Sequence, residues 1–322
     1  MLPRRHLRRT VALTVVLAAA LLAQRHVAAE PVNMGQGISI VWAPAYVANS
    51  QGLWQHQGIE PNVILFPSGR AAQEALVGGG VVWSTVAETP VMFASLNGLP
   101  VRIIATMNAY DCFELAATKE IASAQDLKGK KVGYSQGTNS QVYLTRLLAL
   151  IGAQPSDITA ISLSPSDMVS SLSNGNIDAF IWTEPHLSQA VALDPNRFHR
   201  VRTPDVYKCY HNVVTLQSTI DNNPDVLVKS LRALMEAVDY IQAQPEAAIA
   251  IAAEAVKMDP SIAASAWKEI PFAIDLNTEE LIADLEAEAK WAMEVGLAPP
   301  NAQMPDFTKV VVPDLLQAAK QQ

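Results

Sequence analysis

The sequence has few charged residues, few aromatic residues and almost no cysteine. Only 17% of its 322 residues are charged and 6% are aromatic, whereas 50% are hydrophobic. This composition is too apolar for a disordered chain, and the length suits one large domain or two modest ones. Basic residues are the scarcer charge, at 23 against 31 acidic ones. Nucleic acids and anionic membrane surfaces are therefore poor candidate partners.

The arginines gather at the start of the chain, where residues 1–29 are typical of a secretory signal peptide. A basic stretch from Arg4 to Arg9 precedes an apolar run from Val11 to Ala23. That run is shorter than the roughly 20 residues that span a bilayer. Small residues end the segment and predict cleavage after Ala29. An uncleaved signal anchor is the alternative. We expect an exported protein that works in the periplasm.

Cys112 and Cys209 are the only two cysteines. Neither has the CxxC or Cys/His spacing of a zinc site, so no metal is expected. Export to an oxidising compartment permits a disulfide between them, and the alternative is two unpaired cysteines packed as small hydrophobic residues.

Motifs of catalysis are also missing. The sequence contains no GxSxG elbow, no HExxH, no Walker loop and no strand-linked GxGxxG, and its six histidines are scattered. We therefore expect neither an enzyme nor a bound cofactor.

Short apolar runs alternate with helical stretches along the rest of the chain, a pattern typical of βαβ units with parallel strand pairs. The predicted strands are 38–41, 63–66, 81–86, 101–107, 132–134, 158–163 and 177–182. Helices are predicted around 46–53, 71–77, from 88 onwards, 143–150 and 168–172, with long ones at 224–241 and 281–295.

Ligands of open α/β sheets bind beyond the carboxyl ends of the strands, at helix N-termini. The turn from Ser135 to Ser140 fits this rule best. Gly137 permits close approach of a ligand to the backbone, and Thr138 and Asn139 supply donors before a helix begins. The turn is therefore either an anion site or an ordinary helix cap.

Two further strand ends carry polar residues. Ser68 and Gly69 precede Arg70, which either pairs with a carboxylate, sulfonate or nitrate or is simply solvated. Glu88, next to Thr89, and Glu184 stand where apolar strands end. As ligand contacts they would suit an amine or a protonated heterocycle; the alternative is that each caps its own helix.

Several stretches, in this order, resemble the periplasmic substrate-binding proteins of ABC importers, specifically the nitrate/sulfonate/taurine and thiamine-precursor (NMT1/THI5-like) group. The matching stretches are 41–48 (VWAPAYVA), 52–54 (GLW), 57–61 (QGIEP), 69–72 (GRAA), 87–90 (AETP), 126–133 (DLKGKKVG), 137–140 (GTNS), 175–179 (GNIDA) and 182–185 (WTEP). They cover residues 35–215, and the helical tail fits by length alone.

The resemblance implies a type II periplasmic binding fold, a two-lobed venus flytrap whose lobes are mainly parallel sheets flanked by helices, with a helical C-terminal region. Lobe I would hold residues 30–111 and 210–322, and lobe II residues 112–209. The chain would cross between lobes near 108–112 and 208–211, with Cys112 at one crossing and Cys209 at the other. This layout favours the disulfide.

The same layout implies a ligand site between the lobes. Trp42, Tyr46 and Tyr110 are candidate aromatic walls or core residues, and Asn108 and His211 lie at the crossings. The whole candidate set is Trp42, Tyr46, Ser68, Gly69, Arg70, Glu88, Thr89, Asn108, Tyr110, Ser135, Gly137, Thr138, Asn139, Ser140, Glu184 and His211.

The implied function is that of a monomeric receptor that captures a small organic ligand by hinge closure and delivers it to an inner-membrane ABC permease. Sulfonates, taurine-like zwitterions and related small anions come first as ligands. An aromatic or heterocyclic compound such as a thiamine pyrimidine precursor is the alternative. A third possibility is a periplasmic sensory module for a membrane kinase. The yeast enzymes of this group use a cysteine-rich metal motif, which two cysteines cannot supply.

Overall fold

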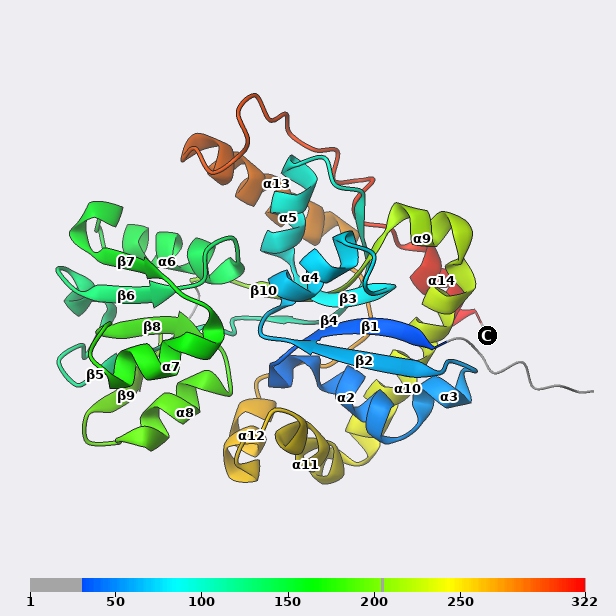
Figure 1. Ribbon diagram of the computed structural model, residues 1–322, viewed down its shortest axis with the longest axis horizontal. Coiled ribbons are helices and arrows are strands. Elements are labelled where there is room, and N and C mark those ends of the chain that lie inside the picture. The colour runs from blue at the N-terminus through cyan, green and yellow to red at the C-terminus, as the bar shows by residue number, and fades with distance from the viewer. Residues whose placement is uncertain (1–30, 204–205, 322) are drawn as a thin grey trace, which may run out of the picture. The chain divides into compact units, whose positions relative to one another are not determined.

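The structure, a computed structural model, describes residues 31–203 and 206–321. The predicted signal peptide lies outside the described residues. Two five-stranded sheets, each flanked by helices, dominate the fold (Figure 1). No helix within the described ranges is both long and apolar enough to cross a membrane.

The first sheet is built from four strands of the N-terminal third of the chain and one later strand. Its spatial order is β2 (Pro61–Phe66), β1 (Val32–Gly37), β3 (Trp83–Ala87), β10 (Cys209–Leu216) and β4 (Val101–Tyr110). Strand β1 is parallel to both of its neighbours, whereas β10 is antiparallel to β3 and β4. The sheet is therefore mixed.

All strands of the second sheet come from the middle of the chain. Its order is β7 (Thr159–Ser162), β6 (Lys131–Tyr134), β8 (Ala179–Trp182), β5 (Glu114–Thr118) and β9 (Phe198–Val201). Strand β5 is antiparallel to β8 and β9. In each sheet four of the five strands run in the same direction and one strand, β10 or β5, runs against its neighbours. The prediction of mainly parallel sheets flanked by helices is therefore confirmed, with the addition that both sheets are mixed.

Helices follow most strands and cover the sheets. They are α2 (Ala43–Ser50), α3 (Leu53–His56), α4 (Gly69–Val77), α5 (Glu88–Leu96), α6 (Asn139–Leu150), α7 (Pro165–Ser173), α8 (His186–Leu193), α9 (Gln217–Asn222), α10 (Pro224–Ala243), α11 (Pro245–Ala255), α12 (Pro260–Trp267), α13 (Thr278–Glu294) and α14 (Asp314–Lys320). Short 3₁₀ turns lie at Ile40–Trp42, Ala124–Leu127 and Pro155–Asp157. The predicted helices at 71–77, 88 onwards, 143–150, 168–172, 224–241 and 281–295 are confirmed.

Three apolar clusters hold these layers together. One face of the first sheet packs against α2, α3, α10, α11 and α14, and its other face packs against α5 and α13. A separate cluster joins the second sheet to α6, α7 and α8. Each sheet therefore buries its apolar side chains in cores of its own, which is the main source of folding free energy.

The predicted strand at 38–41 is wrong. The first strand lies earlier, at Val32–Gly37, and Ile40–Trp42 forms a buried 3₁₀ turn that leads into α2. Parallel pairing with β2 extends from Val32 to Gly37, and it ends where Ser39 turns the chain toward Pro44 in the first turn of α2. The apolar residues that suggested a strand at 38–41 therefore lie in and just before the 3₁₀ turn. Strands β5, β9 and β10 are not among the predicted ones.

Candidate functional site

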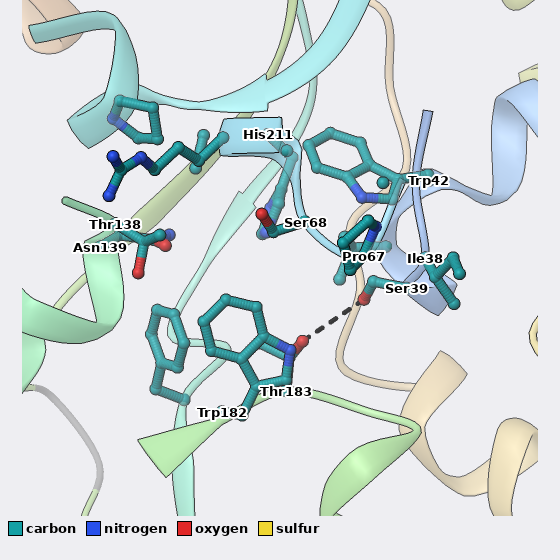
Figure 2. A pocket seen from close by; sticks show the side chains of 17 residues that line it. Ile38, Ser39, Trp42, Pro67, Ser68, Thr138, Asn139, Trp182, Thr183 and His211 are labelled. Carbon is teal, nitrogen blue, oxygen red and sulfur yellow. Dashed lines mark hydrogen bonds between the residues drawn. The ribbon is translucent and has the colours of Figure 1, made fainter. Parts of the chain in front are cut away.

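A cavity of about 50 Å³ lies where the strand ends of the two sheets face each other (Figure 2). The first sheet and its helices contribute Gly37, Ile38, Ser39, Val41, Trp42, Pro67, Ser68, Gly69, Arg70, Ala87, Pro90 and His211 to the wall. The second contributes Phe113, Thr138, Asn139, Trp182 and Thr183. Of the sixteen residues predicted as ligand contacts, Trp42, Ser68, Gly69, Arg70, Thr138, Asn139 and His211 line this cavity.

Ser68 and Gly69 bring the N-terminus of α4 to the cavity. Ser68 is extended and its hydroxyl oxygen accepts a hydrogen bond from the Ala71 N–H at 3.2 Å, so it caps the helix. A Cβ on Gly69 would lie 3.0 Å from the Thr85 carbonyl oxygen, so only glycine fits against β3. Ser68 satisfies the Ala71 N–H, so the N–H groups of Gly69 and Arg70 are the ones in this first turn that have no partner within the helix and can reach an acceptor in the cavity.

The turn before α6 supplies the opposite wall. Thr138 caps α6, and its hydroxyl donates to the Ser135 carbonyl within the turn at 2.8 Å. The hydrogen of this hydroxyl is therefore not available to a ligand. Within the described residues, the carboxamide of Asn139 forms no hydrogen bond to protein, although the residue is buried. Asn139 is therefore the group of this turn whose donors are free for a ligand, and Thr138 positions it.

His211 closes the cavity from β10. It is 3% exposed, and its Nδ1 has no hydrogen-bond partner in the described structure. Burial lowers the pKa of His211 to about 3, so the imidazole is neutral. The ring packs edge-on against Trp42, with centroids 5.0 Å apart. His211 is thus an uncharged polar group held by aromatic neighbours, with one nitrogen left to bind a ligand.

Arg70 reaches across the cavity mouth. Its guanidinium donates from Nε to Glu74 at 3.1 Å and from Nη1 to the Gln136 carbonyl oxygen, which lies beyond the other wall. Gly137 has a φ of +72°, and a Cβ there would stand 2.6 Å from Nη1 of Arg70. Glycine at 137 therefore lets Arg70 bridge the two walls.

No Asp or Glu is among the described residues that line the cavity. Glu184 does not face the cavity: its carboxylate accepts hydrogen bonds from the Ser188 backbone N–H and hydroxyl, at 3.1 and 2.7 Å, and pairs with Arg200 at 2.5 Å. Among the lining residues Arg70 is the only charged one, because His211 is neutral. The alternative that Glu184 caps its own helix describes what the structure shows.

Glu88 and Thr89 also point away from the cavity. Glu88 contacts the hydroxyl of Tyr207 and accepts from the Tyr210 N–H at 2.7 Å. The Thr89 hydroxyl donates to Glu288 at 2.8 Å. The expectation that Glu88 meets a cationic ligand finds no geometric basis here, because Tyr207 and Tyr210, before and in β10, hold this carboxyl.

The remaining predicted contacts have other tasks. Tyr46 donates to the Gly37 carbonyl at 3.2 Å, and Asn108 donates to the Val41 carbonyl at 2.8 Å. Tyr110 faces a separate hollow behind the strands. Ser135 and Ser140 bond each other inside their turn, with the Ser135 N–H 2.9 Å from the Ser140 hydroxyl. These residues shape the walls without lining the cavity.

Ten of the lining residues are absent from the predicted set, and four of them bring hydroxyl or aromatic side chains to the cavity: Ser39, Phe113, Trp182 and Thr183. Ser39 lies 3.4 Å from the Thr183 hydroxyl and donates to the Glu184 carbonyl at 3.0 Å, so it joins the two sheets at the cavity floor (Figure 2). Phe113 and Trp182 pack against each other at 6.0 Å and form an aromatic wall. Trp182 ends β8 and Thr183 follows it, and both stand in the WTEP stretch, a signal that was available in the sequence.

Cys112 and Cys209 meet behind this cavity. Strand pairing places Cys209 opposite Tyr110, and the two sulfur atoms are 2.6 Å apart. Both are free thiols in this structure, so the disulfide stays a prediction. The described residues contain no group of three or more His, Cys, Asp or Glu that could hold a metal ion.

Comparisons with known proteins identify the family. The model of the family described as NMT1/THI5 like matches residues 39–248, and the chain belongs to this family. A putative binding protein of Brucella abortus is 26% identical over 263 residues, which are 78% of this chain and 79% of that protein.

Two more relatives carry a ligand in their names. A putative aliphatic sulfonates-binding protein of Escherichia coli is 26% identical over 203 residues, covering 62% of this chain and 63% of its own. Among solved structures, the alkanesulfonate-binding protein SsuA from Xanthomonas axonopodis pv. citri, bound to MOPS, superposes with a TM-score of 0.76 at 18% identity, over 88% of this chain and 98% of that one. That similarity establishes the periplasmic binding protein fold.

Proposed function

We propose that the protein is a periplasmic solute-binding protein that captures a small organic anion, of which a short sulfonate is the leading candidate. The observation that carries this proposal is the character of the cavity wall. It offers the free carboxamide of Asn139, the neutral imidazole of His211, two helix N-termini and Arg70, and no carboxylate. Such a wall favours negative charge.

The size of the cavity supports a compact ligand. About 50 Å³ has room for roughly four groups of water size. A sulfonate group has four heavy atoms, so this volume suits a head group of that size. The aromatic faces of Trp42, Phe113 and Trp182 would cover the apolar part of such a ligand. The printed names of the sulfonate-binding relatives agree with this choice.

The proposed mechanism is closure of two lobes, residues 30–111 with 210–322 and residues 112–209, about the crossings near 108–112 and 208–211. Two contacts between the cavity walls, Arg70 to Gln136 and Ser39 to Thr183, would form on closure. Residues of both lobes would then present one surface to an ABC permease. The family resemblance supports this importer role.

Calorimetric titration with a panel of ligands tests the proposal. We expect methanesulfonate, ethanesulfonate and taurine to bind, with the charge on Arg70 and the helix termini favouring them over matched amines. A 4-aminopyrimidine is included in the panel as the representative of the heterocyclic ligands. Tight binding of the pyrimidine or of an amine, with no heat from any anion, would exclude the anion receptor and favour the heterocycle alternative.

We also propose that Cys112 and Cys209 form a disulfide in the exported protein. The bridge would close a loop of 97 residues, worth about 4–5 kcal/mol in the chain-entropy model. Non-reducing peptide mapping of periplasmic protein should find the two peptides joined, and a reductant should lower the Tm. The Cys112→Ser variant should have the reduced Tm with or without reductant. Two free thiols in the exported protein would contradict the bridge.

A further inference from the structure

A buried cluster of two carboxyl groups and one tyrosine lies outside the cavity wall and has no part in the proposed ligand binding. Glu88 begins α5, Glu288 lies in α13, and Tyr207 precedes β10; they are 1%, 1% and 3% exposed. The two helices pack against each other over the first sheet (Figure 1). Tyr207 belongs instead to the apolar cluster of the second sheet.

Counting hydrogens shows that this cluster must hold an extra proton. The Tyr207 hydroxyl contacts Oε1 of Glu88, lies 2.5 Å from Oε1 of Glu288, and lies 3.1 Å from the Thr89 hydroxyl, whose single hydrogen is donated to Glu288. A tyrosine hydroxyl has one hydrogen, and an ionised carboxylate only accepts. If both glutamates were ionised, one of these buried contacts would join two acceptors with no hydrogen between them. One carboxyl is therefore protonated.

The other hydrogen bonds assign the proton to Glu88. Glu288 already accepts from the Thr89 hydroxyl at 2.8 Å, and Arg146, whose guanidinium lies 4.7 Å from the centre of the Tyr207 ring, favours its charged form. Glu88 accepts from the Tyr210 N–H through Oε2, at 2.7 Å. Its Oε1 then donates to Tyr207, and Tyr207 donates to Glu288.

The electrostatic surroundings of the two carboxyl groups also favour a proton on Glu88. Burial first, and the charge of Glu288 next, raise the pKa of Glu88 well above its usual range. Burial also raises the pKa of Glu288, against the opposing effects of Thr89 and Arg146. The other ionisable groups around the cluster are Asp284, bonded to the Tyr210 hydroxyl, the Lys208–Glu280 ion pair, and the thiols of Cys112 and Cys209.

We propose that Glu88, Tyr207 and Glu288 form a buried proton-binding site that ties helices α5 and α13 of the first sheet to the core of the second. Ala87 and Pro90, on either side of Glu88 and Thr89, line the cavity, so the same tie fixes that wall. Release of the proton would leave two facing carboxylates in an apolar setting and weaken the tie.

The sign of the pH effect follows from linkage. The unfolded chain releases the Glu88 proton near the ordinary glutamate pKa of about 4.3, whereas the folded chain keeps it to higher pH. The stability from this site is therefore complete at acidic pH and is lost as pH rises through the raised pKa. Above the ordinary glutamate range, the folded protein should bind about one proton more than the unfolded protein.

Infrared spectroscopy across a pH titration tests the site in the mature protein. We expect the carbonyl band of a protonated carboxylic acid at pH 7, its loss at alkaline pH, and its absence in Glu88→Gln. The glutamine amide can donate to Tyr207 and accept from Tyr210, so this variant should fold. Between pH 5 and pH 9 its Tm should fall less than the Tm of the wild-type protein does. Glu246→Gln, an exposed glutamate in the first turn of α11, is the matched control and should keep the band.

The possible outcomes separate cleanly. A band at pH 7 in wild type and Glu246→Gln that is missing in Glu88→Gln supports the proton site. No acid band in wild type at pH 7, or an unchanged band and pH slope in Glu88→Gln, overturns it. If Glu88→Gln fails to fold, the band and its titration in wild type decide. None of these measurements depends on the ligand or on the importer.

Discussion

Replacing Asn139 with aspartate is expected to abolish anion binding while leaving the fold intact. The change replaces the free amide donor at the cavity wall with a negative charge. A lost hydrogen bond to a charged ligand costs about 1.5–3 kcal/mol, and facing like charges cost several kcal/mol more. The affinity should therefore fall more than about 100-fold, at roughly 1.4 kcal/mol per tenfold. Calorimetric titration with ethanesulfonate measures it.

The same variant distinguishes the ligand classes. Aspartate as the first residue of α6 interacts favourably with the helix dipole, so the Tm should change little. Ser166→Asp is the matched control: it adds the same charge near the N-terminus of α7, at an exposed position of the same sheet's helical layer, away from the cavity. Tighter binding of an amine by Asn139→Asp than by wild type would indicate a cationic ligand and end the anion proposal.

Strand ends were the part of the site that the sequence could predict. Ser68–Arg70 and Thr138–Asn139 follow apolar runs and combine glycine, small hydroxyls and an amide, which are the residues that cap helices at the carboxyl edge of a sheet. The conformation of such a turn depends on its own residues, so it can be predicted from a short stretch of sequence. They accordingly line the cavity in the structure.

The direction of the two glutamates could not be predicted in the same way. Glu88 is held by the Tyr207 hydroxyl and the Tyr210 N–H, which lie far along the chain, and Glu184 is held by Ser188 of the helix that follows it and by Arg200. Contacts beyond the two strand ends therefore decide where each carboxyl points. Strand β1 was missed for a different reason. Its sequence, VNMGQG, has low strand propensity, and pairing with β2 and β3 overrides that preference.

Replacing Gly37 with alanine is expected to damage both stability and binding. Gly37 ends β1, its N–H donates to the Thr85 hydroxyl at 3.0 Å, and it lines the cavity. A Cβ there would meet the Gly69 backbone nitrogen at 3.0 Å, the Trp42 indole nitrogen at 3.1 Å and the Ser68 carbonyl carbon at 3.2 Å. Backbone on one side and a buried indole on the other leave the methyl group no room.

Overpacking of this kind costs about 1–3 kcal/mol, so the Tm of Gly37→Ala should fall by several degrees. Relief of the clash must move the start of α4 or Trp42, and both line the cavity, so ligand affinity should fall about tenfold or more. Gly35→Ala is the matched control on the same face of β1. Its Cβ would meet side-chain atoms of Val81, Ser84 and Phe66, at 3.2–3.4 Å, and none of these residues lines the cavity. Gly35→Ala should lose less stability and keep its affinity. If both variants bind the ligand as wild type does, the junction of β1, α4 and Trp42 does not shape the binding site.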